Sequence, residues 1–178
     1  TDSLFTPSFA GNNLNVLERY YECALTHNFD IIMRITADCP FIDPIVCEEV
    51  ITMLLMKEAD YASNVHPKRT YPKGLDCEVF TMDCLEACWM ENQKMYKSIG
   101  CPDADGRKRY KKGYDGGIMI SPKPYYYDAE HVTPWMQRHP LVRKVSVEQK
   151  TEHDVSEIDY CVDNPGDIER LERLYEKD

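Results

Sequence analysis

Apolar residues along this chain recur with helical spacing in some stretches and form short continuous runs in others, which predicts alternating helices and strands. The clearest run, residues 29–36, is apolar enough to be a central strand of a sheet that is covered on both faces. A helix at residues 14–27 precedes it and carries an apolar stripe. A second helix at residues 44–57 follows it, with Asp43 as its N-cap.

The alternation continues through the later part of the chain. Further strands are predicted at residues 60–64, 74–80, 142–147 and 158–162, and further helices at residues 82–93, 131–139 and 165–175. Strands and helices that alternate in this way predict an α/β fold with a mostly parallel sheet. A chain of 178 residues is the size of one domain, so we expect a single domain over residues 1–178.

A polar stretch rich in glycine interrupts the pattern at residues 100–117, and it includes the basic run Arg107–Lys112. Such composition is typical of an insertion or a mobile flap, which we place at about residues 95–128.

The charge balance limits the classes of partner. The formal net charge is -10, which argues against a nucleic-acid backbone or an anionic membrane as the main partner. No apolar run reaches the length of a membrane span, and the first residues lack a basic-then-apolar secretory pattern. The eight cysteines contain no C-x-x-C pair, so we expect reduced thiols and a cytoplasmic protein.

Two aspartates follow apolar runs directly. Asp38 comes after the strand at residues 29–36, and Asp163 comes after the predicted strand at residues 158–162. Ligands of open α/β sheets bind just outside the carboxyl ends of strands. If the two strands are neighbours, both carboxylates face one crevice and suffice for Mg²⁺ with substrate phosphates. Each aspartate alone is equally explained as a turn former or a helix cap.

Three further residues form a second candidate group in the strand at residues 74–80. Gly74 allows the backbone to approach a ligand closely. Asp76 and Glu78 are two residues apart and are expected on one face, where they could accept hydrogen bonds from sugar hydroxyls or support the metal. A solvated edge strand would explain the same pattern.

Charged side chains elsewhere complete the set of candidates. Arg34 lies inside an apolar strand, so its guanidinium needs a phosphate or an acidic partner, for which Asp60 is one choice. Glu130 and His131 could perform acid–base chemistry or bind a sugar, although a histidine at a helix start is more often structural.

Six segments in this order resemble the spore-coat polysaccharide cytidylyltransferase-like family (the SpsF type), whose relatives are the CMP-sialic acid and CMP-Kdo synthetases. The segments are Asn15–Tyr21, Arg34–Pro44, Asp60–Asn64, Gly74–Phe80, Glu130–Pro134 and Val162–Glu169. The resemblance implies a nucleotide-diphospho-sugar transferase fold (GT-A-like), which is a three-layer α/β/α sandwich. It also implies Mg²⁺ and CTP, with Asp38 and Asp163 as the metal-binding aspartates.

The implied reaction converts CTP and a sugar to a CMP-sugar and pyrophosphate for surface polysaccharide biosynthesis. Arg34, Glu130 and His131 would then be the catalytic residues, and Asp38, Gly74, Asp76 and Glu78 would hold the nucleotide and sugar. The expected partners are these small molecules, and a homodimer is compatible with the family.

The chain also departs from the family. The family opens with a strand and a Gly/Arg/Lys-rich loop around the triphosphate, and nothing before Asn12 resembles it, so we expect an N-terminally truncated portion of the fold. Ala129 and Asp159 stand where the family often has arginine. These departures leave two alternatives open: a catalytically inactive member that binds a sugar or a protein, and a GT-A glycosyltransferase, whose usual D-x-D motif is missing at Asp38-Cys39-Pro40.

Overall fold

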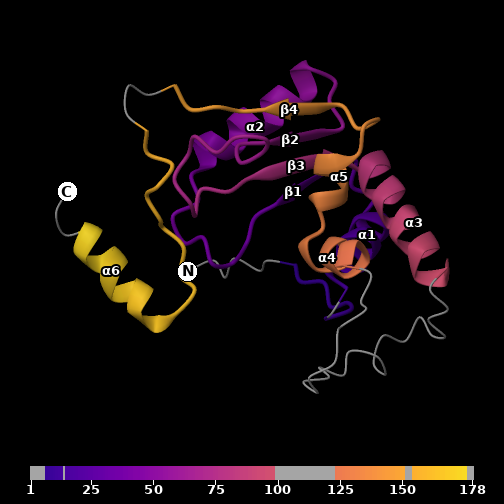
Figure 1. Cartoon of the computed structure of the whole chain (residues 1–178), viewed down its shortest axis with the longest axis horizontal. Coiled ribbons are helices and arrows are strands. Elements are labelled where there is room, and N and C mark those ends of the chain that lie inside the picture. The colour runs from indigo at the N-terminus through magenta and orange to yellow at the C-terminus, as the bar shows by residue number, and fades with distance from the viewer. Residues whose placement is uncertain (1–6, 14, 99–122, 151–153, 176–178) are drawn as a thin grey trace. The chain divides into compact units, whose positions relative to one another are not determined.

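A computed structural model describes residues 7–13, 15–98, 123–150 and 154–175 (Figure 1). The chain divides into two compact units, which we describe separately. One unit comprises Thr1–Asp30 and Leu85–Arg138, and the other comprises Ile31–Cys84 and His139–Asp178. No helix in the described ranges combines the length and the apolar character that a membrane crossing requires.

The second unit contains the sheet. Its elements are β1 (Ile31–Arg34), α2 (Pro44–Met56), β2 (Tyr61–Ser63), β3 (Glu78–Thr81), β4 (Lys144–Ser146) and α6 (Pro165–Tyr175). The strand order is β1-β3-β2-β4 (Figure 1). The predicted mixture of strands and helices is therefore confirmed.

The prediction of a mostly parallel sheet is wrong for the strands described. β3 pairs antiparallel with both β1 and β2, and only the β2–β4 pair is parallel. The reason lies in the connections. α2 links β1 to β2 and keeps those two strands in the same direction, whereas no helix lies between β2 and β3. Without a crossover helix, β3 returns in the opposite direction and inserts between β1 and β2.

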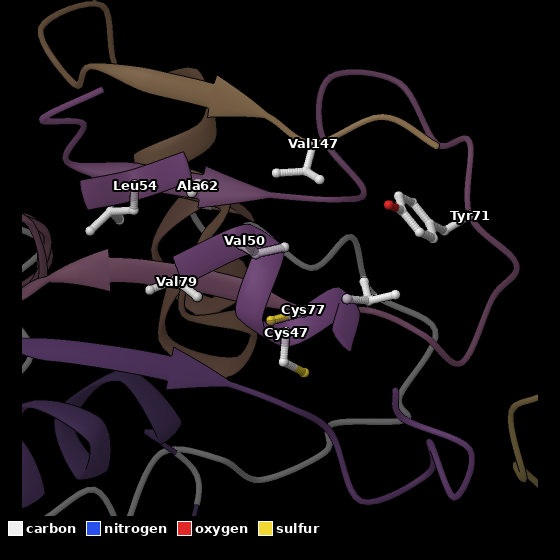
Figure 2. Close-up of a cluster of buried hydrophobic side chains, with 9 residues drawn as sticks. Cys47, Val50, Leu54, Ala62, Tyr71, Cys77, Val79 and Val147 are labelled. Carbon is white, nitrogen blue, oxygen red and sulfur yellow. The ribbon is translucent and has the colours of Figure 1, made fainter. Parts of the chain in front are cut away.

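α2 covers the sheet, and the hydrophobic core lies between them. Asp43 caps the helix by accepting a hydrogen bond from the Ile45 N–H at 2.8 Å, and Pro44 occupies the first turn, as the sequence predicts. The buried residues of this core share apolar or thiol side chains and come from α2, the strands and two loops (Figure 2). They are Val46, Cys47, Val50, Leu54, Ala62, Tyr71, Cys77, Val79 and Val147.

The predicted strand at residues 158–162 is not formed, and one isolated bridge between Lys73 and Asp159 takes its place. Two aspartate side chains bind backbone N–H groups here, one just before the predicted strand and one within it. The Asp154 carboxylate accepts from the Ser156 N–H at 2.9 Å, and the Asp159 carboxylate accepts from the Cys161 N–H at 2.9 Å. Such local bonds compete with a sheet ladder.

The first unit is helical. Its elements are α1 (Val16–His27), most of α3 (Met82–Ser98), α4 (Lys123–His131) and α5 (Pro134–Arg138). Asn15 caps α1 by accepting from the Glu18 N–H at 3.0 Å, and Tyr21 of α1 stacks on Trp89 of α3 with ring centroids 4.2 Å apart. α3 extends past its predicted end at residue 93, and residues 99–122, most of the predicted insertion, lie outside the described residues.

Of the helix predicted at residues 131–139, only α5 (Pro134–Arg138) forms, and α4 (Lys123–His131) is a separate helix that begins inside the predicted insertion. Val132 has a φ of 72°, which a right-handed helix cannot accommodate. Pro134 then starts α5, because a proline is tolerated in the first turn but not in the interior of a helix. The break puts Glu130 and His131 at the end of α4.

Candidate functional site

The turn that follows β1 holds the first predicted metal ligand, Asp38. The Cys39 N–H donates to the Thr36 carbonyl at 3.2 Å and closes this turn. Asp38 is half-buried, and a hydrogen bond with the Thr36 side chain is the main reason why the pKa of its carboxyl lies below the ordinary value. The nearby charge of Arg34 acts in the same direction. Asp38 is therefore an ionised carboxylate at neutral pH.

The segment of the second predicted ligand lies beside this turn. The Val162 N–H donates to the Asp38 carbonyl at 2.8 Å, so the two aspartate-bearing segments meet although residues 158–162 form no strand. Asp163 itself is exposed, and its backbone N–H donates to the Asp167 carboxylate at 3.1 Å. The contact that joins the segments is thus made by backbone atoms.

Two thiols lie against Asp38. Potential ligand atoms of Asp38, Cys39 and Cys161 are all within 4.8 Å of one another. Burial raises the pKa of the Cys39 thiol, and it raises the pKa of the Cys161 thiol to about 12, with nearby acidic groups adding to both effects. Sequence reasoning missed these two residues. A signal was available, because each thiol is within two positions of a predicted metal-binding aspartate.

Gly74 supports the segment that carries Cys161. Its φ is 90°, and a Cβ atom at this position would lie 2.8 Å from the Tyr160 carbonyl carbon and 3.0 Å from the Cys161 backbone nitrogen. The flanking Lys73 N–H donates to the Ile158 carbonyl, and the Tyr160 N–H donates to the Lys73 carbonyl, both at 2.8 Å. The close approach that the structure records at Gly74 is to the chain's own backbone.

Substitution of Gly74 by alanine is expected to destabilise the protein by roughly 2–4 kcal/mol, since a positive φ and a steric clash act together. Urea unfolding followed by circular dichroism measures the change. Gly166→Ala is the matched control, because Gly166 has no positive φ and meets only the exposed Asn164 side chain at 3.2 Å. Equal stability of the two variants would show that the close approach at Gly74 is unimportant.

Arg170 of α6 holds the same segment from the other side. Its guanidinium donates to the Cys161 carbonyl at 2.9 Å and to the Asp159 carbonyl. Lys73 lies 3.8 Å from the Asp159 carboxylate, and both cations help to hold the pKa of Asp159 below its ordinary value, although its hydrogen bond with the Cys161 backbone is the largest cause. The acidic residue at position 159 is therefore balanced by cations of its own unit.

Asp76 and Glu78 differ in their surroundings. Asp76 precedes β3 and forms a two-pronged ion pair with Arg69, with distances of 2.5 and 2.8 Å. Glu78 is buried in β3, where it accepts from Arg34 at 2.8 Å and from the Tyr61 hydroxyl at 2.6 Å. The expectation that both residues lie in one strand is wrong, because β3 begins at Glu78; their predicted roles at a ligand stay predictions.

Arg34 has a buried acidic partner, but the partner is Glu78 and not Asp60. The two residues are directly opposite each other in the β1–β3 register. Asp60 binds Arg143 instead, with an Nη2–Oδ1 distance of 2.7 Å. Spacing along the sequence cannot show which of these two acidic residues pairs with Arg34. That choice depends on the register between β1 and β3, which are neighbours in the sheet but not consecutive in the chain.

Glu130 and His131 belong to the helical unit, whereas Asp38 and Cys161 belong to the sheet unit. Both are exposed, and the His131 ring lies against Tyr127 with ring centroids 4.3 Å apart. Their predicted roles stay predictions.

An apolar cavity of about 580 Å³ adjoins the Asp38 turn. Its lining residues come from the turn, from the residue before Asp163 and from α6; they are Ala37, Pro40, Phe41, Val162, Ile168, Leu171 and Glu172. The aspartate-bearing segments thus border a recess with apolar walls.

The donor set fits Mg²⁺ only in part. Mg²⁺ prefers oxygen ligands and is commonly held by one or two carboxylates together with substrate phosphates. The ionised Asp38 carboxylate meets this requirement, and the exposed Asp163 carboxylate is in the adjoining segment. The Cys39 and Cys161 thiols do not suit Mg²⁺, because sulfur is a soft ligand.

The sequence matches no family profile. It is similar to the uncharacterized protein MJ1063 of Methanocaldococcus jannaschii, with 32% identity over 96 residues, which cover 54% of this chain and 38% of that protein. The chain therefore spans well under half of the length of this relative.

A solved structure shares the fold over nearly the whole chain. It is the structure of a cytidylyltransferase from Leptospira borgpetersenii serovar Hardjo-bovis, which superposes with a TM-score of 0.68 at 24% identity. The match covers 96% of this chain and 58% of that one. The chain thus has a mixed α/β fold similar to that of a cytidylyltransferase.

Proposed function

We propose that this chain is part of a nucleotidyltransferase of the cytidylyltransferase type, which converts CTP and a sugar to a CMP-sugar and pyrophosphate for surface polysaccharide biosynthesis. The observation that carries the proposal is the 2.8 Å hydrogen bond between the Val162 N–H and the Asp38 carbonyl. It brings both predicted metal-binding segments together in a fold that is shared with a cytidylyltransferase.

In this proposal, Asp38 and Asp163 hold Mg²⁺. The bound ion would neutralise the charge on the CTP phosphates and on the departing pyrophosphate. The chain's own task is to present ionised carboxylates. The Thr36 side chain and the Arg34 charge keep Asp38 in that form, since both lower the pKa of its carboxyl. Arg34 is then a positioning residue, because its guanidinium is bound to Glu78.

The remaining predicted residues keep their roles as part of the proposal. Glu130 and His131 would bind the sugar or transfer a proton, and Gly74 and Asp76 would support the nucleotide side. The reaction would occur in the cytoplasm, where thiols persist, and every cysteine within the described ranges is a free thiol.

The proposal extends to the whole fold. It takes the described elements as part of a GT-A-like three-layer α/β/α sandwich, for which the fold similarity is the support. The proposed reaction also requires a triphosphate-binding loop, and no residues before Asn12 resemble the loop of the family.

A non-catalytic binding module is the second candidate, and two positions favour it. Ala129 and Asp159 stand where arginine would bind phosphate in the family that the sequence resembles. Ala129 is fully buried, and Asp159 contributes a negative charge. A module of this kind would bind a sugar or a protein without turnover.

Calorimetric titration with CTP, GTP and ATP, with and without Mg²⁺, tests the proposal. We expect CTP to bind only with Mg²⁺ and at least about tenfold more tightly than the other nucleotides, which corresponds to about 1.4 kcal/mol. The same titration on a chain extended upstream shows whether further residues are required. Absence of Mg²⁺-dependent CTP binding in both forms would leave the binding module as the better explanation.

A further inference from the structure

The cluster of Asp38, Cys39 and Cys161 has a chemistry that the proposed reaction does not use. Its three donors come from two segments far apart in the sequence, and potential ligand atoms lie within 4.8 Å of one another. Cys39 is buried, and the other two residues are half-buried. The 2.8 Å backbone bond from Val162 to Asp38 fixes the two segments together.

Two sulfurs and one carboxylate oxygen form a donor set for a thiophilic cation. Soft thiolate ligands select Zn²⁺ and similar ions, whereas Mg²⁺ prefers oxygen. A tetrahedral site with Zn–S bonds of about 2.3 Å places its sulfurs about 3.8 Å apart. The two sulfurs, which lie within 4.8 Å of each other, therefore need to approach by about 1 Å at most.

We propose that Asp38, Cys39 and Cys161 bind a thiophilic divalent cation such as Zn²⁺, with a fourth coordination position left for water. Each thiol releases its proton to solvent as its sulfur–metal bond forms. The Cys39 thiol already lies 3.6 Å from the Asp38 Oδ1, and the Thr36 hydroxyl lies 3.2 Å from the same sulfur. These contacts orient the sulfur next to the carboxylate before any ion arrives.

A second pair of neighbouring thiols, Cys47 and Cys77, serves as a comparison for the cluster of Asp38, Cys39 and Cys161. Cys47 and Cys77 interact within the apolar core beneath α2 (Figure 2). Among the described residues, no third His, Cys, Asp or Glu completes a ligand group around that pair. Thiol proximity alone therefore does not define the proposed site; the partly exposed carboxylate of Asp38 does.

The binding of this ion does not depend on the proposed function. One consequence does, because a thiophilic ion that uses Asp38 competes with Mg²⁺ for the same carboxylate. Zn²⁺ would then inhibit Mg²⁺-dependent turnover. Direct measurement of ion binding separates the two proposals, since it requires neither CTP nor turnover.

The test is titration of the 178-residue chain with Co²⁺ and Zn²⁺ in the presence of a non-thiol reductant. We expect Co²⁺ to give thiolate charge-transfer absorption and intense tetrahedral bands, and Zn²⁺ to displace it. Zn²⁺ affinity is measured by competition with a chromophoric chelator. Cys39→Ser and Cys161→Ser should each weaken Zn²⁺ binding by more than about 100-fold, because loss of even an outer-shell partner costs 10–100-fold.

Cys23→Ser is the matched control, since Cys23 is also half-buried but lies outside the cluster. It should keep the full Co²⁺ spectrum. Asp38→Asn retains both thiols and should weaken binding while preserving thiolate absorption. Circular dichroism without metal shows which variants are folded. The proposal is overturned if the wild-type chain gives no thiolate absorption with Co²⁺, or if folded Cys39→Ser and Cys161→Ser bind Zn²⁺ as tightly as Cys23→Ser.

Discussion

Replacement of Asp38 by asparagine is expected to lower Mg²⁺-dependent nucleotidyl transfer by more than about 100-fold, or about 2.7 kcal/mol of transition-state stabilisation. The substitution preserves the shape of the side chain and removes the negative charge that would hold the cation. Asp163→Asn should have a similar effect, although Asp163 is exposed and Asp38 is half-buried. Turnover is measured as pyrophosphate release from CTP, in a chain extended upstream to include a triphosphate-binding loop.

Asp43→Asn is the control for this pair. Asp43 lies in the same connection between β1 and α2, and asparagine caps a helix as well as aspartate does. The control therefore removes the same charge near the site and leaves the fold unchanged. Near-normal turnover in Asp38→Asn or Asp163→Asn would exclude that residue as a metal ligand, and an equal loss in Asp43→Asn would point to a general effect of charge.

Local signals in the sequence were sufficient for α2 and α6. α6 has its predicted ends, Pro165 and Tyr175, and α2 begins at its predicted cap and ends one residue early. Caps and prolines act on neighbouring residues, so the sequence specifies them directly. The direction of β3 could not be predicted from such local signals, because it depends on the path of the connection between β2 and β3, which contains no helix.

Only those features of the candidate site that depend on a single segment of the chain could be predicted from the sequence. The sequence predicted that the Asp38 and Asp163 segments meet only if their two strands were neighbours, and in the structure a backbone bond from Val162 to Asp38 joins them although residues 158–162 form no strand. The choice of Glu78 over Asp60 as the partner of Arg34 follows from strand register. The Cys161 thiol lies near Asp38 on a segment whose backbone Gly74 admits closely. Contacts of this kind arise from tertiary packing, which no local pattern reveals.

Glu78→Ala is expected to destabilise the protein by about 3–5 kcal/mol, the usual cost of removing one partner from a buried ion pair. The Glu78 side chain is 6% exposed and that of Arg34 is 19% exposed, so little water can replace the lost carboxylate. The Tyr61 hydroxyl, which donates to Glu78 at 2.6 Å, also loses this acceptor. Urea unfolding followed by circular dichroism measures the loss.

Two further variants separate charge from packing. Glu78→Gln keeps the shape and can still accept from Tyr61, so its loss should be smaller than that of Glu78→Ala. The double variant Arg34→Met/Glu78→Leu removes both charges and should recover most of the stability, since apolar residues often replace a buried pair without cost. A change within about 0.5 kcal/mol in Glu78→Ala would contradict the prediction. Loss in the single variant and recovery in the double variant would together assign the cost to the uncompensated charge of Arg34, rather than to a cavity in the centre of the sheet.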